Sequence, residues 1–355
     1  MTPLRSVPLA PRTTLGVGGA AAHYVEPTTL NELRGALEYA RERALEVVVL
    51  GGGSNMLIAD RGLAGLVVCL RSTGLVFDEA SLTVRVDAGT PWDELVRWST
   101  ERGLSGLECL SGIPGSVGAA PMQNIGAYGQ EVASTIVAVE VLERASGRLI
   151  EFTREACLFG YRESVFKTDA AEEYIVTSVT FALSKEPPSL RYAELARALD
   201  GLSAPSVSAV RDAVIELRRS KSMLCDTDDP NGRSAGSFFV NPTVSTGEAD
   251  ELGERARRAG VTSPMPRFAH EDGVKLSAGW LIEHSGFAKG TRRGAVGLST
   301  KHCLAIVTRD GATALDVVRF ATEVRQRVRD VFGVTLSPEP RAYGFEPEEV
   351  DSLYS

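Results

Sequence analysis

The sequence predicts an α+β fold. Strand-like runs and helical segments follow one another without the strict alternation of a doubly wound sheet. Two of the helical segments begin with capping signals, and glycine is enriched, at 35 of 355 residues. A chain of this length is expected to form two or three domains with full-sized cores.

Composition narrows the class of protein. The chain is 43% hydrophobic and 24% charged, as in ordinary soluble globular proteins. No apolar run reaches membrane-spanning length and no signal-peptide pattern opens the sequence, so we expect a cytoplasmic protein without a membrane partner. A net charge of −8 argues against general nucleic-acid binding, although a local basic cluster can still hold a phosphorylated ligand. Nothing in the sequence indicates an obligate protein partner.

Cysteine and histidine patterns indicate neither a disulfide framework nor a metal site. The five cysteines are odd in number, widely spaced and never arranged as CxxC. The four histidines show no metal-ligand spacing. We therefore expect no metal.

The first helix is predicted by a capping box. Thr29 stands three residues before Glu32, and leucines then recur at helical spacing, which predicts a helix over residues 30–43. A short β-branched run over residues 46–50 follows and predicts a buried strand.

That strand ends in the run Gly51-Gly52-Gly53-Ser54-Asn55. A dinucleotide-binding GxGxxG loop would need glycine where the sequence has Met56, and no helix opens after it. A Rossmann nucleotide site is therefore excluded. The run is either a ligand loop or a tight turn between strands.

A strand and a second capped helix are predicted next. Residues 82–88 alternate at period two. Thr90 is then expected to be the N-cap, with Pro91 at the first helical position and Asp93 closing a capping box, for a helix that runs to about residue 102.

The remaining elements follow from the same periodicities. A hairpin is predicted from residues 136–142 and 149–152, and another strand over 175–183. Amphipathic helices are predicted over residues 205–219, 247–258 and 314–332. Composition changes near Pro205, which is the expected domain boundary, with a return crossing near Gly333.

The stretch 111–129, SGIPGSVGAAPMQNIGAYG, is the most unusual part of the chain. Its 19 residues include no Lys, Arg, Asp or Glu and five glycines. Gly and Pro break it too often for a helix, and it is too apolar for a solvated loop. Glycines allow main-chain N–H groups to approach a ligand, and successive turns can direct several of them at phosphate. The alternative is a buried glycine-rich crossing between two elements.

Three polar residues stand in settings that suit chemistry. Arg162 lies in an aromatic and charged loop, Ser237 follows a glycine and precedes two phenylalanines, and Glu339 is held between two prolines. Their structural alternatives are a surface ion pair, a strand-start serine and a rigid turn. Ser237 has no nearby histidine or G-x-S-x-G elbow, so a hydrolase triad has no local support.

A basic group, Arg218, Arg219 and Lys221, closes the helix that starts near Pro205. It could clamp a diphosphate, or simply complement the helix dipole. Tyr192 would suit stacking on, or hydrogen bonding to, a nucleotide sugar.

Six segments in one order resemble the UDP-N-acetylenolpyruvoylglucosamine reductase (MurB) family of peptidoglycan biosynthesis. They are VVVLGGGSNMLI, SGIPGSVGAAPMQNIGAYGQE, YRESVFK, AGSFFVNP, KLSAGWLIEHSGFAKG and PEPR. Tyr192 within LRYAEL resembles the loop-bearing subtype, in which a tyrosine covers the substrate. One difference is Thr13, where the family usually has Asn.

The resemblance implies a two-lobed FAD-binding domain of the vanillyl-alcohol-oxidase type and a third lobe for a UDP-sugar. The implied bounds are residues 1–72, completed by about 333–355, for the first lobe, 73–204 for the second and 205–332 for the substrate domain. FAD is expected to be non-covalent, since neither glycine loop holds a His or Cys, with NADPH as the electron-donating co-substrate.

The resemblance also assigns residues. The catalytic set is Arg162, Ser237 and Glu339, with Arg162 and Glu339 stabilising an enolate and Ser237 protonating it. The UDP-sugar contacts are Tyr192, Arg218, Lys221 and Asn241. The FAD contacts are Gly51, Gly52, Gly53, Ser54, Asn55, Ser111, Pro114, Gly115, Gly118, Gln123, Asn124, Ile125, Tyr128 and Ile175.

Two other functions fit the same residues. A flavin oxidase acting on an alcohol would share the broad fold and would reoxidise rapidly in air. A nucleotide-sugar-binding protein would contain no flavin. Visible flavin colour in the purified protein separates both flavin enzymes from the binder. The oligomeric state and the choice of NADPH over NADH do not follow from the residues.

Overall fold

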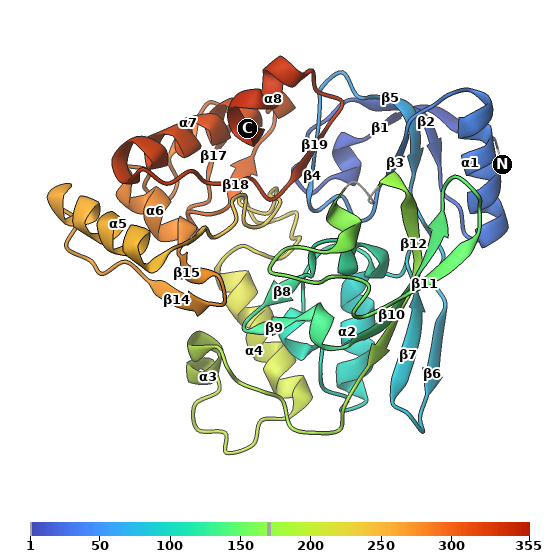
Figure 1. The fold of residues 1–355 in the computed structure, drawn as a ribbon, viewed down its shortest axis with the longest axis horizontal. Coiled ribbons are helices and arrows are strands. Elements are labelled where there is room, and N and C mark those ends of the chain that lie inside the picture. The colour runs from blue at the N-terminus through green and yellow to red at the C-terminus, as the bar shows by residue number, and fades with distance from the viewer. Residues whose placement is uncertain (1, 169–171) are drawn as a thin grey trace. The chain divides into compact units, whose positions relative to one another are not determined.

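The computed structural model describes residues 2–168 and 172–355 (Figure 1). The chain forms two compact units, and each unit is assembled from three separate segments. Unit 1 comprises Met1–Val7, Ala21–Gly53 and Ala64–Ser220. Unit 2 comprises Pro8–Ala20, Ser54–Leu63 and Lys221–Ser355.

Unit 1 is built from two lobes. The elements of the first lobe are β1 (Leu4–Pro8), β2 (Ala20–Val25), α1 (Leu30–Glu42), β3 (Val47–Val49) and β5 (Leu63–Val68). Those that follow it are β6 (Leu75–Asp78), β7 (Thr83–Asp87), α2 (Trp92–Glu101), β8 (Gly126–Ala127), β9 (Gln130–Glu131), β10 (Ile136–Glu143), β11 (Leu149–Thr153), β12 (Tyr174–Ala182), α3 (Ala193–Ala198) and α4 (Val207–Ser220).

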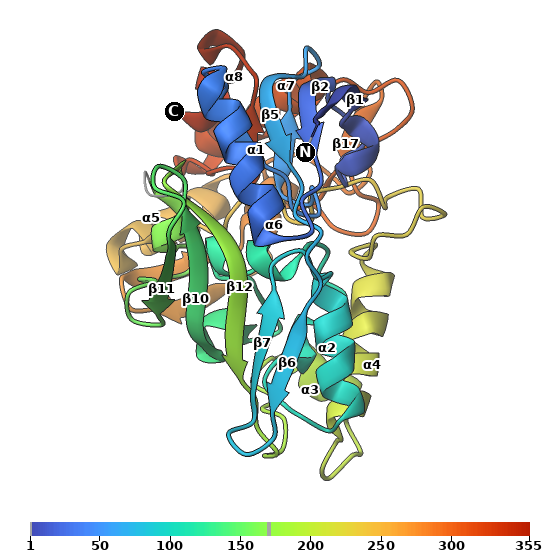
Figure 2. The ribbon, with the colours of Figure 1, turned by 90° about the vertical axis from the view of Figure 1, so that its right-hand side faces the viewer.

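The first lobe is a four-stranded sheet in the order β1-β2-β5-β3, with α1 packed against it (Figure 2). The predicted helix is confirmed, with its capping box: the Thr29 hydroxyl accepts from the Glu32 amide, and the Glu32 carboxylate accepts from Thr29. Leu33 and Leu37 are on the buried face of α1, where they meet Leu66 of β5. The strand predicted over residues 46–50 is β3, and it pairs with β5 in parallel.

The second lobe is a five-stranded antiparallel sheet in the order β11-β10-β12-β7-β6. The predicted hairpin is confirmed as β10 and β11, and the strands predicted over 82–88 and 175–183 are β7 and β12. Helices α2 and α4 lie side by side next to this sheet (Figure 2). Trp92 of α2 is buried against Phe181 of β12, edge to face.

The two lobes of unit 1 are joined by side chains from both. The Arg34 guanidinium donates to the Gly147 carbonyl (3.1 Å), and Arg144 donates to the Val47 carbonyl (3.0 Å). Leu142 of β10 and Ile175 of β12 are buried in the core of the first lobe. Unit 1 therefore has continuous packing from one sheet to the other.

The start of α2 differs from the prediction. The helix begins at Trp92 with Pro91 as N-cap and no side-chain cap, whereas Thr90 and Asp93 were expected to form a capping box. That prediction was wrong: among the described residues the Thr90 hydroxyl has no hydrogen-bond partner, and the Asp93 carboxylate binds groups outside its own helix. The Thr90 amide, which a capping box would pair with the Asp93 carboxylate, donates instead to the Asp87 carbonyl (3.1 Å), and the Asp93 carboxylate accepts from the Gly112 amide and from Arg211.

Unit 2 contains β4 (Met56–Ile58), β13 (Thr243–Val244), α5 (Thr246–Arg258), β14 (Arg267–His270), β15 (Gly273–Leu276), α6 (Ala278–His284), β16 (Arg292–Arg293), β17 (Val296–Leu298), β18 (Ile306–Thr308), α7 (Ala314–Phe332), β19 (Arg341–Tyr343) and α8 (Pro347–Tyr354). Two small three-stranded sheets have the orders β13-β15-β14 and β16-β17-β18. The predicted helices α5 and α7 are confirmed, and α7 ends at Gly333 in a left-handed conformation (φ 78°).

The core of unit 2 draws on both ends of the sequence. Leu15, Val17 and Leu57 are buried in the same cluster as the inner face of α7. The parallel pairing of β4 with β19 joins Met56 to Arg341 in register. The Thr13 hydroxyl donates to the Val17 carbonyl (3.1 Å), so threonine provides a side-chain hydrogen bond in this first turn.

These sheets confirm the α+β class. In the described ranges 2–168 and 172–355, no helix is long and apolar enough to cross a bilayer. The predicted boundaries at residues 72, 204 and 332 remain predictions.

Candidate active site

The two glycine loops meet within unit 1. A Cβ atom placed on Gly52 would lie 2.6 Å from the Gly115 Cα atom, which no side chain tolerates. A Cβ on Gly118 would lie 2.5 Å from the Ala88 Cβ atom. Glycine is required at both positions because main chain packs there directly against neighbouring atoms.

Where these loops meet, several main-chain N–H groups donate no hydrogen bond to the residues that the structure describes. Within the described part of the chain, no hydrogen-bond acceptor is found for the amides of Gly51, Gly52, Gly53, Gly115 and Ser116. Amides in turns that are left without protein partners form anion-binding concavities. The residues present therefore fit the diphosphate of a dinucleotide such as FAD.

Asn124 holds the second half of the glycine-rich stretch in shape. It is buried and left-handed (φ 44°). Its side-chain amide donates to Glu131 Oε2 and to the Gly160 carbonyl (both 2.9 Å), and its Oδ1 accepts from the Ala133 amide (3.0 Å). These bonds tie the stretch to the loop that carries Arg162.

Arg162 is fixed by the same stretch. Its Nη1 donates to the Asn124 carbonyl (3.3 Å) and its Nη2 to the Gly126 carbonyl (2.9 Å). Its own backbone is left-handed (φ 59°), a conformation that costs energy in a non-glycine residue. The Lys167 ammonium donates to the Arg162 carbonyl (2.8 Å) and so secures that backbone. The guanidinium is thus positioned by main-chain atoms of the glycine-rich stretch.

Tyr128, Tyr192 and Arg218 come together in unit 1. The two tyrosine rings meet edge to face with centroids 5.5 Å apart. Burial raises the pKa of Tyr128 to about 12, and the neighbouring positive charge of Arg218 opposes that rise. Arg218 is 8% exposed on the inner face of α4. A tyrosine of the predicted flavin loop therefore lies beside two predicted substrate residues.

Ser237 and Glu339 come together in unit 2. Their segments run antiparallel, with Phe239 bridged to Pro338. The Glu339 amide donates to the Phe238 carbonyl (2.8 Å), and the Glu339 carbonyl accepts from the Asn55 side-chain amide (3.3 Å). Ser237 and Glu339 are both half-buried. Three residues far apart in sequence are therefore neighbours in unit 2, whereas Arg162 belongs to unit 1.

Several predicted site residues have structural partners. The Ser111 hydroxyl donates to the Glu108 carbonyl (2.6 Å), and Asn241 Oδ1 accepts from the Ala278 amide (2.9 Å) at the start of α6. Ile175 is buried in the first-lobe core, and Ile125 packs on the second-lobe core. The ligand contacts of these residues, and of Ser54, Pro114, Gln123 and Lys221, remain predictions.

Some residues that shape the site carry no signal in the sequence. The buried Glu108 carboxylate accepts from the Gly106 amide (2.6 Å) and from Gln130 (3.3 Å), just before the glycine-rich stretch. Burial opposes ionisation of Asp93, but hydrogen bonds from Arg211 and Gly112 lower the pKa of its carboxyl below the usual value. Asp93 and Arg211 are 118 residues apart, so their pairing cannot be seen in one sequence.

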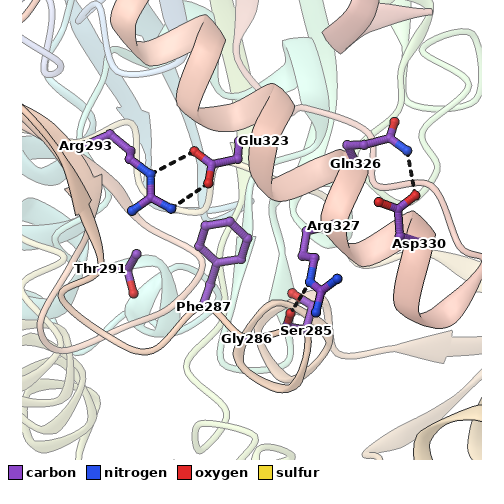
Figure 3. Close-up of a pocket in the computed structure, with 9 residues that line it drawn as sticks. All are labelled: Ser285, Gly286, Phe287, Thr291, Arg293, Glu323, Gln326, Arg327 and Asp330. Carbon is purple, nitrogen blue, oxygen red and sulfur yellow. Dashed lines mark hydrogen bonds and ion pairs between the residues drawn. The ribbon is translucent and has the colours of Figure 1, made fainter. Parts of the chain in front are cut away.

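A separate cavity of about 430 Å³ lies in unit 2 beside α6 and α7 (Figure 3). Its polar groups satisfy one another: Arg293 pairs with Glu323, and Gln326 donates to Asp330. Phe287 lies below the Arg293–Glu323 pair in the view of Figure 3. Two arginines and two carboxylates line the cavity, so their formal charges cancel. The cavity therefore offers no net positive charge to bind an anionic cofactor. In the ranges that the structure describes, no group of three or more His, Cys, Asp or Glu residues is placed to hold a metal.

Comparison with known proteins agrees with this geometry. The family model of an FAD binding domain matches residues 21–153, and that of the UDP-N-acetylenolpyruvoylglucosamine reductase C-terminal domain matches residues 228–343. The chain is therefore a flavin-dependent oxidoreductase that binds FAD.

Relatives of known name extend the match to nearly the whole chain. A UDP-N-acetylenolpyruvoylglucosamine reductase of Thermobifida fusca is 46% identical over 349 residues, which cover 96% of this chain and 98% of the relative. That of Salinispora arenicola is 48% identical over 92% of both chains. The crystal structure of the reductase from Thermus caldophilus matches with a TM-score of 0.67 and 29% identity, over 97% of this chain and 99% of the other. The chain belongs to the UDP-N-acetylenolpyruvoylglucosamine reductase family.

Proposed function

We propose that the chain reduces UDP-N-acetylglucosamine enolpyruvate to UDP-N-acetylmuramate with NADPH, a step in the synthesis of peptidoglycan precursors in the cytoplasm. The reaction balances as one hydride from NADPH and one proton: hydride is added at C3 of the enolpyruvyl double bond and the proton at C2. The observation that carries the proposal is the near-full-length match to reductases of this name.

The FAD would be held non-covalently by the main-chain amides of Gly52, Gly53, Gly115 and Ser116, with the other predicted contacts around them. Bound FAD supplies the redox chemistry, because it can accept a hydride from a nicotinamide and deliver it to the substrate. The close contact of Gly52 with Gly115 supports this assignment, since it leaves room for main-chain donors and none for side chains. Acid precipitation should release all flavin colour to the supernatant, and colour in the pellet would contradict non-covalent binding.

The chemistry of the substrate needs positive charge and a proton. Hydride addition at C3 builds negative charge on C2 and the adjoining carboxylate. The Arg162 guanidinium would stabilise that charge, and one such donor is typically worth ~2.7–4 kcal/mol. Glu339 would assist as a hydrogen-bond donor in its protonated form, since an ionised carboxylate only accepts. Ser237 would deliver the proton to C2, and a hydroxyl can do so because the enolate is a strong base.

The UDP moiety would be bound by Arg218 and Lys221 through its phosphates, with Tyr192 over the substrate and Asn241 at the sugar. The position of Arg218 and Tyr192 beside Tyr128 supports the assignment of these two residues. The chain as a whole is acidic, so the attraction for the UDP phosphates is expected to come from Arg218 and Lys221 themselves and not from the net charge of the protein.

Anaerobic stopped-flow absorbance at the flavin band tests the proposal. NADPH should bleach the oxidised flavin, and UDP-N-acetylglucosamine enolpyruvate should then restore it in a stoichiometric second phase. Reoxidation by oxygen with no response to the UDP-sugar would instead indicate an oxidase. A protein without flavin absorbance would indicate a nucleotide-sugar binder.

A further inference from the structure

A two-pronged ion pair joins α2 to α4 in unit 1. Arg211 Nη1 lies 2.7 Å from Asp93 Oδ1, and Arg211 Nη2 lies 2.6 Å from Asp93 Oδ2. The arginine side chain is 15% exposed and the aspartate 40%. A planar guanidinium that meets a carboxylate in this way fixes both orientation and distance.

The same carboxylate also holds the glycine-rich stretch. The Gly112 amide donates to Asp93 Oδ1 at 2.6 Å. Two further bonds come from the first residue of α2: the Trp92 amide donates to the Gly115 carbonyl and the Trp92 indole to the Leu110 carbonyl, both at 3.0 Å. The first turn of α2 therefore sets the path of the main chain around Gly115, whose amide is one of the donors proposed for the diphosphate.

On the other side of the pair, α4 also carries Arg218. Arg211 and Arg218 are seven residues apart, about two helical turns, and so lie on one face of α4. Arg218 lies beside Tyr128 near the end of the stretch, whereas Arg211 binds Asp93 beside its start. α4 therefore reaches the start of the predicted flavin loop through Asp93 and packs against its end at Tyr128.

We propose that Asp93 and Arg211 are positioning residues that link FAD binding to UDP-sugar binding. The pair holds Gly112 and the following amides for FAD, and it holds α4 so that Arg218 is in place for the UDP-sugar. Because binding energies are reciprocal, each ligand then strengthens the binding of the other. This inference rests on the proposed function for the identity of the second ligand.

The test compares Arg211→Met and Asp93→Asn with a matched control, Arg293→Met. The control removes an arginine that also meets a carboxylate with two bonds, at 3.1 and 2.6 Å to Glu323, in unit 2 (Figure 3). Ultrafiltration of the holoenzyme, with and without UDP-sugar, measures released FAD and hence the FAD Kd. Steady-state kinetics at saturating FAD measure the KM for UDP-sugar.

We expect the FAD Kd and the UDP-sugar KM to rise together in both pair variants, each by about tenfold, within the usual range for coupled sites. UDP-sugar should protect bound FAD in the wild type and protect it less in the variants. NADPH-driven flavin reduction at saturating FAD should stay within about twofold of the wild-type rate, because the pair is proposed to act on ligand binding and not on the chemical step. A tenfold change in Kd corresponds to about 1.4 kcal/mol of binding free energy. Arg211→Lys should rescue only partly, since an ammonium cannot make the fork.

Other outcomes would overturn the inference. A lower unfolding temperature with unchanged FAD Kd and KM would make the pair merely structural. A raised FAD Kd with an unchanged KM would show that the pair positions only the flavin loop and does not affect UDP-sugar binding. If the UDP-sugar changes neither FAD release nor flavin reoxidation in the wild-type enzyme, the result would count against the proposed function. In that case the FAD Kd of the variants, measured without UDP-sugar, still decides whether the pair holds the flavin loop.

Discussion

The main-chain amide of Glu339 donates a 2.8 Å hydrogen bond to the carbonyl oxygen of Phe238. The bond sets the carboxyl-bearing residue of the PEPR segment beside the segment of Ser237. It is made by main-chain atoms alone, so either side chain can be changed without removing it. That separation makes the proposed roles of Ser237 and Glu339 testable one at a time.

Replacing Ser237 by alanine should leave the flavin spectrum and NADPH-driven reduction intact, because neither uses the hydroxyl. Reoxidation by the UDP-sugar should slow by roughly 10²–10⁴-fold, the usual contribution of a positioned acid. Ser237→Cys should retain more activity than alanine, since a thiol can deliver a proton. Stopped-flow absorbance resolves the two phases, and wild-type reoxidation in Ser237→Ala would remove Ser237 from the mechanism.

Lys167→Met should weaken the second half-reaction without releasing FAD. The Lys167 ammonium holds the Arg162 carbonyl, and without it the left-handed backbone can relax and withdraw the guanidinium from the Asn124 and Gly126 carbonyls. We expect reoxidation to slow by about tenfold, which corresponds to one hydrogen bond of a charged group. Lys185→Met, at an exposed position, is the control. If both variants reoxidise equally fast, Lys167 does not position Arg162.

Gly52→Ala should abolish FAD binding, because its Cβ would lie 2.6 Å from the Gly115 Cα atom. Gly35→Ala is the matched control: no atom lies within 4 Å of its added Cβ, and the position is inside α1. The control should keep FAD and gain roughly 0.5–1 kcal/mol of stability from its helix. Flavin absorbance and thermal unfolding report both effects. A yellow Gly52→Ala protein would show that this contact is not part of the cradle.

Lys221→Ala should raise the KM for the UDP-sugar by about tenfold or more, as expected for a lost charge-assisted bond to phosphate. NADPH-driven flavin reduction should be nearly unchanged. Arg219→Ala is the control, because Arg219 is exposed and pairs with Glu216 on its own helix. Equal damage to both half-reactions in Lys221→Ala would assign Lys221 to the flavin or to the fold.

Stability should fall as the pH drops below the ordinary pKa of histidine, 6.5, in part because of His23. The buried ring accepts from Arg5 at Nε2 (2.8 Å) and so donates to the Tyr39 hydroxyl from Nδ1 (2.8 Å). Burial, together with the charge of Arg5, lowers the pKa of His23 in the fold. The unfolded chain therefore binds the proton first, so stability is full above pH 6.5 and is lost below it.

Thermal unfolding between pH 7.5 and 5.5 measures this effect. His23→Gln should flatten the pH dependence relative to the wild type, since an amide can accept from Arg5 but does not titrate. Identical slopes for the two proteins would show that other groups govern this range.

Local signals predicted elements where the partners are close in sequence. Thr29 and Glu32 form their capping box because both groups belong to the same helical turn. The similar signal at Thr90 and Asp93 failed because Arg211, 118 residues away, binds the Asp93 carboxylate instead. Such a competitor cannot be identified from periodicity.

The site shows the same division. Composition alone predicted that residues 111–129 form an unusual glycine-rich loop. The structure shows why glycine is needed at Gly118 in that stretch and at Gly52 in the earlier glycine run. The neighbourhood of Ser237, Asn55 and Glu339 depends on pairing between distant segments, which neither motif reveals alone. The short helices α3, α6 and α8 went unpredicted because six to eight residues show too little periodicity.

The division of both units into three segments affects how the chain must fold during its synthesis. Leu15, Val17 and Leu57 leave the ribosome early, yet their core partners lie in α7 and its neighbours near the end of the chain. Unit 1 can close as soon as α4 has emerged, but these apolar side chains must wait until α7, which begins at Ala314, has been synthesised. Nascent chains stalled before residue 314 should therefore leave them open to chaperones and proteases.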